Sequence, residues 1–356
     1  MYDAGSGRGA SRLPRNVILL SKRERSGEGM TNNVGDAPSR MADGFDATRP
    51  RSQVVVLGSL HLDILVHAPD RPKKGETLPG SAWAYKAGGK GGNQAVAAVQ
   101  FGTVASMIGR VGDDDFGRRL LSHLRGAGVD ARHVRIDPGA DSGMSVAIID
   151  AEGDYGAVIV SGANLRLGEE DLREAADVVQ NARVLVLQNE IPEATNLAAA
   201  EVARRHRVGV ILNAAPARPL EPKLAANVDL LVVNAVEAEM ICGVAVTSLG
   251  EAAEAAMRLS EQVANVVVTA GSSGLAVTER GKTPYVEAAH PVRLVDTHGA
   301  GDAFIGALAA RRAGGAPLAE AVSFANAAAA LFVSTPAGQK EFVTPDQVTR
   351  FLFGGS

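Results

Sequence analysis

Cysteine, aromatic residues and long apolar runs are all scarce in this chain of 356 residues. The single cysteine, Cys242, excludes an internal disulfide and favours a reducing, cytoplasmic compartment. Only 4% of residues are aromatic and the formal net charge is −4, so no basic field recruits nucleic acid or an anionic membrane. No apolar run reaches the roughly 20 residues that span a bilayer. These absences favour an enzyme that acts on small molecules.

Two common nucleotide-binding signatures are also missing. Residues 281–283, Gly-Lys-Thr, have the tail of a P-loop, but Ala276 stands where its first glycine belongs. Gly299 and Gly301 begin like a dinucleotide fingerprint, but Phe304 occupies the place of the third glycine. The sequence therefore supports neither a Walker ATPase nor a Rossmann dehydrogenase.

Glycine is abundant at a turn that leads into a helix near the C-terminal third. Residues 296–302 read Asp-Thr-His-Gly-Ala-Gly-Asp, and an apolar run with helical spacing follows. N–H groups at a helix start are unpaired and carry the positive end of the helix dipole, so this turn can hold a phosphate or a developing anion. Asp302 is placed to take a proton from an attacking hydroxyl, and the alternative is that it only caps the helix.

A second glycine-rich turn lies more than two hundred residues earlier. Residues 88–94 read Gly-Gly-Lys-Gly-Gly-Asn-Gln and precede an alanine-rich helical stretch. Glycine lets backbone approach a ligand closely, and Lys90 and Asn93 supply donors suited to sugar hydroxyls. The alternative is an ordinary turn without a ligand.

Together the two turns resemble those of the ribokinase-like carbohydrate kinases, also called the phosphofructokinase-B group. The resemblance covers roughly residues 53–350 and extends through residues 58–63, 234–237, 269–274 and 324–329. It implies an ATP-dependent sugar kinase whose expected substrate is D-ribose, phosphorylated at O5.

The pattern from residue 53 onward predicts an α/β fold. Short β-branched runs alternate with alanine-rich helical stretches, which is typical of three α/β/α layers with a mainly parallel sheet and ligands at the carboxyl ends of its strands. The resemblance adds a small β-sheet lid from segments 64–87 and 142–162, and an edge of this lid could pair two copies in a homodimer. Strands are expected at 54–57, 184–187, 208–212, 230–233 and 266–268, and helices at 115–127, 193–206, 249–260, 301–313, 317–333 and 345–353.

Residues 1–52 differ in composition from the rest. They are rich in Gly, Arg, Ser and Asp and lack sustained periodicity, which predicts a disordered extension. Their acidic residues argue against a transit peptide, and the apolar run at 17–20 is too short for a secretory signal. A translation start at Met30 or Met41 is the other explanation.

The resemblance and the chemistry of phosphoryl transfer together imply catalytic roles. Asp302 is expected to be the base, and the N–H groups of Gly299, Ala300 and Gly301 the anion hole. Asn234 and Glu237 look like the family's Asn-x-x-Glu element, which orders Mg²⁺ and its waters near the phosphates. The alternative for Glu237 is a first-turn carboxylate that satisfies the helix dipole.

The same resemblance implies contacts with ATP. Thr269, Gly271 and Gly274 are expected along the phosphates and ribose, with Asn234 near the phosphates. Asn326 is expected beside the adenine, and the alternative is a packed polar residue in an alanine-rich helix.

For the sugar, Asp63 is expected to accept hydrogen bonds from two hydroxyls. His61 stands where the family's ribose kinases usually carry asparagine, so a nucleoside or another sugar remains an alternative substrate. A non-catalytic sugar sensor is the alternative from another class, and it has no need of a base, a Mg²⁺ element and an anion hole together. The remaining residues expected around the sugar are Gly89, Lys90, Asn93 and Glu190.

A monovalent-cation site is the last implication of the resemblance. Asp296 and the carbonyl of His298 look like half of such a site, and carbonyls around Val333, Pro336 and Gly338 would supply the other half. Potassium bound there would fix the dipoles of the neighbouring loop and is expected as an activator.

Overall fold

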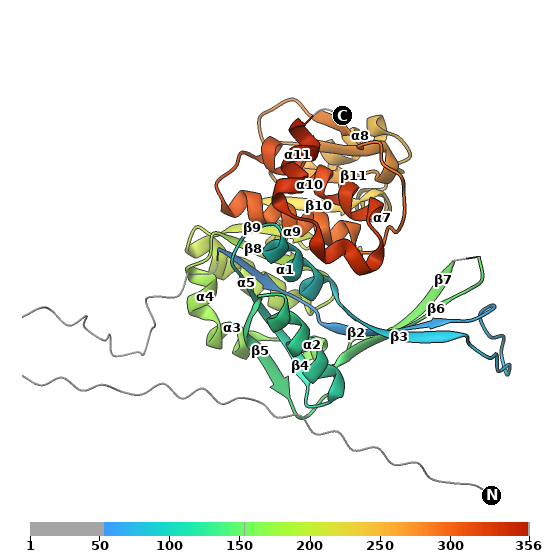
Figure 1. Cartoon of the computed structure of the whole chain (residues 1–356). Helices are drawn as coiled ribbons and strands as arrows, with labels where there is room; N and C mark the ends of the chain where they lie inside the picture. The colour runs from blue at the N-terminus through green and yellow to red at the C-terminus, as the bar shows by residue number, and fades with distance from the viewer. Residues whose placement is uncertain (1–52, 153, 355–356) are drawn as a thin grey trace, which may run out of the picture. The chain divides into compact units, whose positions relative to one another are not determined.

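A nine-stranded sheet lies at the centre of the computed structural model, which describes residues 53–152 and 154–354 (Figure 1). The extension expected at 1–52 lies outside the described residues. Neighbours from β11 to β5 run parallel, and β12 and β13 add an antiparallel edge, so the sheet is mainly parallel as predicted. In order across the sheet the strands are β13 (Tyr285–Ala288), β12 (Gly274–Thr278), β11 (Val266–Thr269), β10 (Leu230–Asn234), β9 (Gly209–Asn213), β8 (Val184–Gln188), β1 (Val54–Leu57), β4 (Ala105–Gly112) and β5 (Asp130–Asp137).

Helices cover both faces of this sheet. The predicted helices are all present, and none of the described helices is long and apolar enough to cross a membrane. The helices are α1 (Lys90–Gln100), α2 (Asp115–Gly126), α3 (Glu169–Glu174), α4 (Ala176–Gln180), α5 (Glu193–Arg205), α6 (Pro222–Ala225), α7 (Ala235–Cys242), α8 (Leu249–Ser260), α9 (Ala300–Ala313), α10 (Leu318–Ser334) and α11 (Pro345–Phe353), with 3₁₀ turns η1 (Gly162–Arg166), η2 (Gly271–Ser273) and η3 (Ala337–Phe342).

The sheet separates two hydrophobic cores. Side chains of a strand alternate between faces, so Val54 and Val56 of β1 enter the core beneath α1, α2, α9, α10 and α11. Val55 and Leu57 enter the opposite core, beneath α3 to α8. All four side chains are fully buried. This arrangement is the predicted three-layer α/β/α fold, and free Cys242 lies half-buried against the second core.

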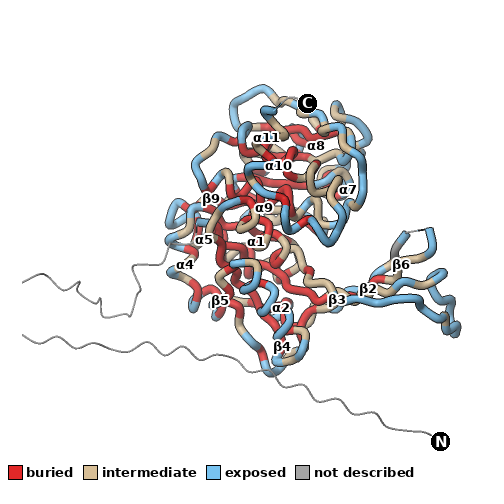
Figure 2. Tube along the Cα trace, viewed as in Figure 1, coloured by how far each residue is buried: buried red, intermediate tan, exposed pale blue. Residues whose placement is uncertain are grey.

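A smaller, separate sheet is formed by the two segments predicted for the lid. Its strand order is β3 (Ala82–Gly88), β2 (His61–His67), β6 (Gly143–Ile149) and β7 (Tyr155–Val160). β2 is buried at His61 and β3 at Gly88. Both strands become exposed toward their other ends, as the colours of Figure 2 show. The buried ends carry the residues predicted to contact the sugar.

Candidate active site

The carboxyl ends of the parallel strands bring the predicted residues to one edge of the large sheet. Glu190 follows β8, Asn213 ends β9, Asn234 ends β10 and Thr269 ends β11. Helices α1 and α9, which pack against each other, begin at the same edge. Open parallel sheets bind their ligands at this position.

Helices α1 and α9 both begin at a glycine in the left-handed region. Gly89 has a φ of 84° and Gly299 a φ of 82°, which other residues adopt only with strain. No described side chain acts as the N-cap of either helix, whereas α2, α7, α8 and α11 each have a capping side chain. The N–H groups of these two first turns must therefore find other partners.

The first turn of α1 is satisfied by the protein itself. The Lys90 N–H donates to the Glu190 carboxylate at 2.9 Å, and the Gly92 N–H donates to the Ser59 carbonyl at 3.0 Å. A Cβ added to Gly91 would lie 2.7 Å from the carbonyl carbon of Gly58. Glycine at position 91 therefore admits the loop between β1 and β2, which packs against it.

The first turn of α9 is more open. Gly301 is exposed, and a Cβ added to it would have no atom within 4 Å. The Ala300 N–H donates to the Thr297 carbonyl at 3.2 Å, so it is engaged within its own loop. This leaves Gly299 and Gly301 as the better-placed donors among the three predicted for the anion hole.

Asp302 lies in the first turn of α9 and is held by two side-chain amides of α1. Asn93 Nδ2 lies 2.9 Å from its Oδ2, and Gln94 Nε2 lies 3.0 Å from its Oδ1. Burial raises the pKa of Asp302, although the charge of Lys90 and the two amides act in the opposite direction. Because Gly299 is the N-cap of α9, Asp302 is not the capping residue. A fixed carboxylate with a raised pKa suits a general base.

Gln94 connects Asp302 to the ends of two strands. Its Nε2 also donates to Asn213 Oδ1 at 3.0 Å, and its Oε1 accepts from Gln188 Nε2 at 2.8 Å. Gln94, Gln188 and Asn213 were not predicted as site residues. Their positions, one in the glycine-rich turn and two at strand ends, were the available signal.

Glu190 gathers groups from the β1–β2 loop and α1. Its carboxylate accepts from the Ser59 hydroxyl and from the Lys90 N–H, and its Oε2 lies 3.9 Å from His61 Nδ1. His61 is only 4% exposed, and its Nε2 has no partner among the described residues. Burial lowers the pKa of His61 against the raising effect of Glu190 and Asp63, so the ring is neutral near pH 7.

Asp63 lies in a row of polar residues across the small sheet. Its cross-strand neighbours are Lys86 on β3 and Ser145 on β6, and the Ser145 hydroxyl donates to Asp63 Oδ1 at 2.5 Å. Burial lowers the pKa of half-buried Lys86, while Asp296 acts to raise it. Lys86 and Ser145 were not predicted, although the alternation of residues in both strands pairs them with Asp63.

Asn234 and Glu237 form a capping box at the start of α7. Asn234 Oδ1 accepts from the Glu237 N–H and Glu237 Oε2 accepts from the Asn234 N–H, each at 2.9 Å. Glu237 is 8% exposed, and burial raises the pKa of its carboxyl group. Glu237 therefore does cap α7, the alternative role considered for it, and the cap uses one of its two carboxylate oxygens.

The residues predicted to contact ATP fall at two places. Thr269 ends β11, and Gly271 and Gly274 follow with φ values of 56° and 120°, which favour glycine. Asn326 lies on α10, where its Nδ2 donates to Glu287 Oε1 at 2.8 Å and to the Ala288 carbonyl at 3.1 Å. These contacts favour the alternative of a packed polar residue for Asn326.

The residues predicted to bind a monovalent cation are already engaged. The ammonium group of Lys340, which was not predicted, contacts the carbonyls of Asp296 and His298. The Val333 carbonyl accepts two backbone N–H groups, from Val295 and Asp296, and the Pro336 carbonyl accepts one from Gln339. Exposed Gly338 lies in η3. The ammonium group of Lys340 therefore occupies the half of the predicted site that Asp296 and His298 form.

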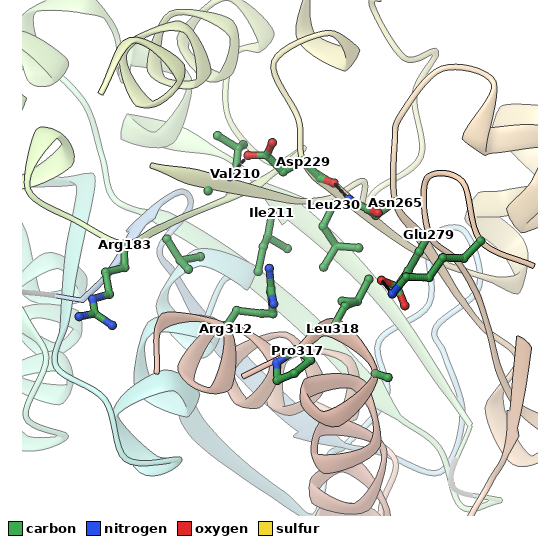
Figure 3. A pocket seen from close by; sticks show the side chains of 14 residues that line it. Arg183, Val210, Ile211, Asp229, Leu230, Asn265, Glu279, Arg312, Pro317 and Leu318 are labelled. Carbon is green, nitrogen blue, oxygen red and sulfur yellow. Dashed lines mark hydrogen bonds and ion pairs between the residues drawn. The ribbon is translucent and has the colours of Figure 1, made fainter. Parts of the chain in front are cut away.

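A cleft of about 420 Å³ opens at the opposite edge of the sheet (Figure 3). Its lining includes Val184, Gly209 and Leu230, the first residues of β8, β9 and β10. None of the predicted site residues lines it. The candidate active site is the carboxyl edge, and this cleft is separate from it.

Comparison with known proteins identifies the family of this chain. Residues 51–344 match the model of the pfkB family of carbohydrate kinases. A ribokinase from Mus musculus is 38% identical over 259 residues, which cover 72% of this chain and 80% of the relative. A deoxyribokinase from Salmonella typhi is 33% identical over 301 residues, covering 84% of this chain and 98% of the relative.

A solved structure extends the likeness to three dimensions. Arabidopsis thaliana ribokinase complexed with ribose and ATP superposes with a TM-score of 0.79 at 30% identity, covering 85% of this chain and 99% of that one. Its likeness includes the large sheet, the helices around it and the smaller sheet. The chain therefore belongs to the pfkB family of carbohydrate kinases, which are phosphotransferases with an alcohol group as acceptor.

Proposed function

We propose that this chain is a ribokinase that transfers the γ-phosphoryl group of ATP to O5 of D-ribose. The observation that carries the proposal is the Asp302 carboxylate, fixed by Asn93 and Gln94 at the open first turn of α9. Relatives named ribokinase, and one of their structures with ribose and ATP, support the choice of substrates.

In the proposed reaction Asp302 accepts the proton of the O5 hydroxyl. The oxygen then forms a bond to the γ-phosphorus while the bond between that phosphorus and the bridging oxygen of ADP breaks. The N–H groups of Gly299 and Gly301 stabilise the negative charge on the transferred group. Thr269, Gly271 and Gly274 would line the path of the nucleotide.

The sugar would lie between the small sheet and the start of α1. The side-chain oxygens of Asp63 and Glu190 are acceptors suited to hydroxyl donors, and the Lys90 side chain adds a donor. We propose that the small sheet acts as a lid at this place. Its closure would exclude water, which competes with the sugar as the nucleophile.

The test is an ADP-release assay over pentoses, deoxyribose, hexoses and nucleosides. We expect D-ribose to give the highest kcat/KM, because polar groups arranged for particular hydroxyls penalise analogues that leave them unpaired. His61→Asn, which places the family's usual residue at this position, is the matched variant. If the wild type prefers another substrate and His61→Asn shifts this preference toward ribose, D-ribose is contradicted as the substrate. The assignment of the chain as a kinase would stand.

Another sugar or a nucleoside is the second candidate substrate, and His61 is the residue that favours it. Its Nδ1 lies 3.9 Å from a Glu190 carboxylate oxygen, and its buried Nε2 has no partner among the described residues. A ligand beside Glu190 would therefore meet an imidazole ring where asparagine would offer an amide. A non-catalytic sensor is less well supported, because it requires neither the amide-held Asp302 nor the open helix start.

We propose that Mg²⁺ is the metal of the reaction, held through water by Glu237. The described residues contain no cluster of three His, Cys, Asp or Glu side chains that could bind a metal. This fits an ion that keeps several waters and uses one carboxylate plus phosphate oxygens. When bound, Mg²⁺ would neutralise charge on the phosphates.

Glu237→Gln is expected to raise the Mg²⁺ concentration for half-maximal rate and to lower kcat. The amide keeps the hydrogen bond to the Asn234 N–H and removes the charge. A Mg²⁺ titration of initial rates measures the effect, with exposed Glu254→Gln as the control. An unchanged titration would leave Glu237 with its capping role alone.

The homodimer through the lid and the cytoplasmic location stay predictions. The exposed apolar side chains of Trp83, Val158 and Ile159 on the small sheet support a contact between two copies there.

A further inference from the structure

Lys340 is a buried lysine whose charge is surrounded by oxygen atoms. It lies in η3, is 6% exposed, and its Nζ lies 2.8 Å from the His298 carbonyl and 3.0 Å from the Asp296 carbonyl. A carboxylate oxygen of Asp296 lies 2.9 Å away. The ring of Phe332 covers the ammonium group at 4.6 Å from its centroid.

These contacts use the full binding capacity of the ammonium group. It has three N–H donors, and three oxygen atoms lie within hydrogen-bonding distance. Two carbonyls and a carboxylate are also the ligands that an alkali-metal ion would use at this position. An ion there would have to displace a covalently tethered charge of the same sign and value, which the surrounding oxygens already neutralise.

The loop that Lys340 contacts leads directly into the proposed anion hole. The His298 N–H donates to Asp296 Oδ1 at 2.9 Å, which closes a turn one residue before Gly299. Phe332 packs beside Gly299, where an added Cβ would lie 3.3 Å from its Cε1. The position of Lys340 therefore affects the orientation of the first N–H groups of α9.

The backbone of Lys340 is also fixed, from the side of α1. Gln100 Nε2 donates to the Lys340 carbonyl at 2.6 Å and to the Val343 carbonyl at 2.9 Å. The backbone at Lys340 is therefore anchored to α1, the helix that supplies Asn93 and Gln94. Lys340 therefore links α1 to the loop that leads into α9.

We propose that Lys340 is a built-in cation that takes the place of an activating alkali-metal ion and positions the anion-binding loop without potassium. It is a positioning residue, because it acts through the carbonyls of Asp296 and His298. The effect on turnover rests on the proposed function, whereas the effect on ion binding does not. The proposal replaces the potassium activation expected from the sequence.

The test compares the wild type with Lys340→Ser in chloride salts of potassium, sodium, lithium and choline at equal ionic strength. The wild type is expected to show equal kcat and equal melting temperature in all four salts. Lys340→Ser is expected to lose about 10- to 100-fold in kcat in choline, as for residues that orient a site from outside it. Potassium is expected to restore both the rate and the melting temperature of the variant more than lithium does.

The control is Lys282→Ser, which removes an exposed lysine paired only with a neighbouring carboxylate in the described structure. It is expected to respond to salt as the wild type does. Activation or thermal stabilisation of the wild type by potassium would overturn the proposal, and this salt series is independent of the folding of any variant. A folded Lys340→Ser protein without a specific response to potassium would overturn it as well.

The two readouts separate this proposal from the proposed function. If the wild type phosphorylates no sugar in any salt, the kinase assignment is contradicted. The melting series still decides whether Lys340 replaces an alkali-metal ion, because ion binding by Lys340→Ser is visible without turnover.

Discussion

Asp302→Asn is expected to lower kcat by about 10²–10⁴-fold, the range in which a general base contributes to rate. Asparagine keeps the shape of the side chain and one oxygen acceptor for the amides of Asn93 and Gln94, but it cannot accept the proton. Sugar and ATP affinity should therefore change little. Single-turnover kinetics together with calorimetric binding of each substrate measure the two effects separately.

The pH profile provides an independent check on the same residue. Burial raises the pKa of Asp302, so its carboxylate becomes protonated at a higher pH than that of an ordinary aspartate. As the pH is lowered, the wild-type kcat/KM should therefore begin to fall at a higher pH than it would with an exposed carboxylate as the base. The pH profile of Asp302→Asn should lack this fall at acidic pH. Asp346→Asn, in the exposed first turn of α11, is the control. Wild-type turnover by Asp302→Asn would contradict the assignment.

Asp63→Asn is expected to raise the KM for the sugar by about 10- to 100-fold and to leave the KM for ATP unchanged. A hydrogen bond to a charged group contributes about 1.5–3 kcal/mol, which corresponds to that change in affinity. The Ser145 hydroxyl at 2.5 Å holds the carboxylate in place, so the substitution should alter chemistry more than position. Initial rates over a matrix of sugar and ATP concentrations measure both constants.

The control for Asp63 is Asp70→Asn, which removes a charge from the exposed segment that follows β2. It should leave both KM values as in the wild type. An equal rise in the two constants for Asp63→Asn would mean that the small sheet had lost its structure rather than a sugar contact.

The strands that could be predicted include those with uninterrupted apolar runs, such as β1 and β8. β4 was missed because serine, glycine and arginine interrupt its apolar residues, although all eight are buried. Arg110 is tolerated there because its Nη1 contacts Asp137 at 2.8 Å and its Nε contacts Asp171 at 2.9 Å. These ion pairs join three segments that are distant in sequence, so the sequence around Arg110 carries no periodicity that would reveal the strand.

The candidate site was predictable to a similar extent. Asp302, Asn93 and Glu190 lie in motifs with a chemical meaning, and the structure brings them to one edge of the sheet. Gln94 and Lys340 were missed for a different reason. Glutamine in a helix and lysine near the C-terminus are usually exposed, and only the packing of distant segments buries them against Asp302 and Asp296.

Gly306 contacts no substrate group, yet it sets how closely α9 approaches α1. A Cβ added there would lie 2.7 Å from backbone atoms of Ala97 and Ala98, so no smaller side chain on α1 could make room for it. Any larger residue must push the two helices apart and draw Asp302 away from Asn93 and Gln94. A glycine in the hydrophobic interior thus sets the distance between the proposed base and the two amides that hold it.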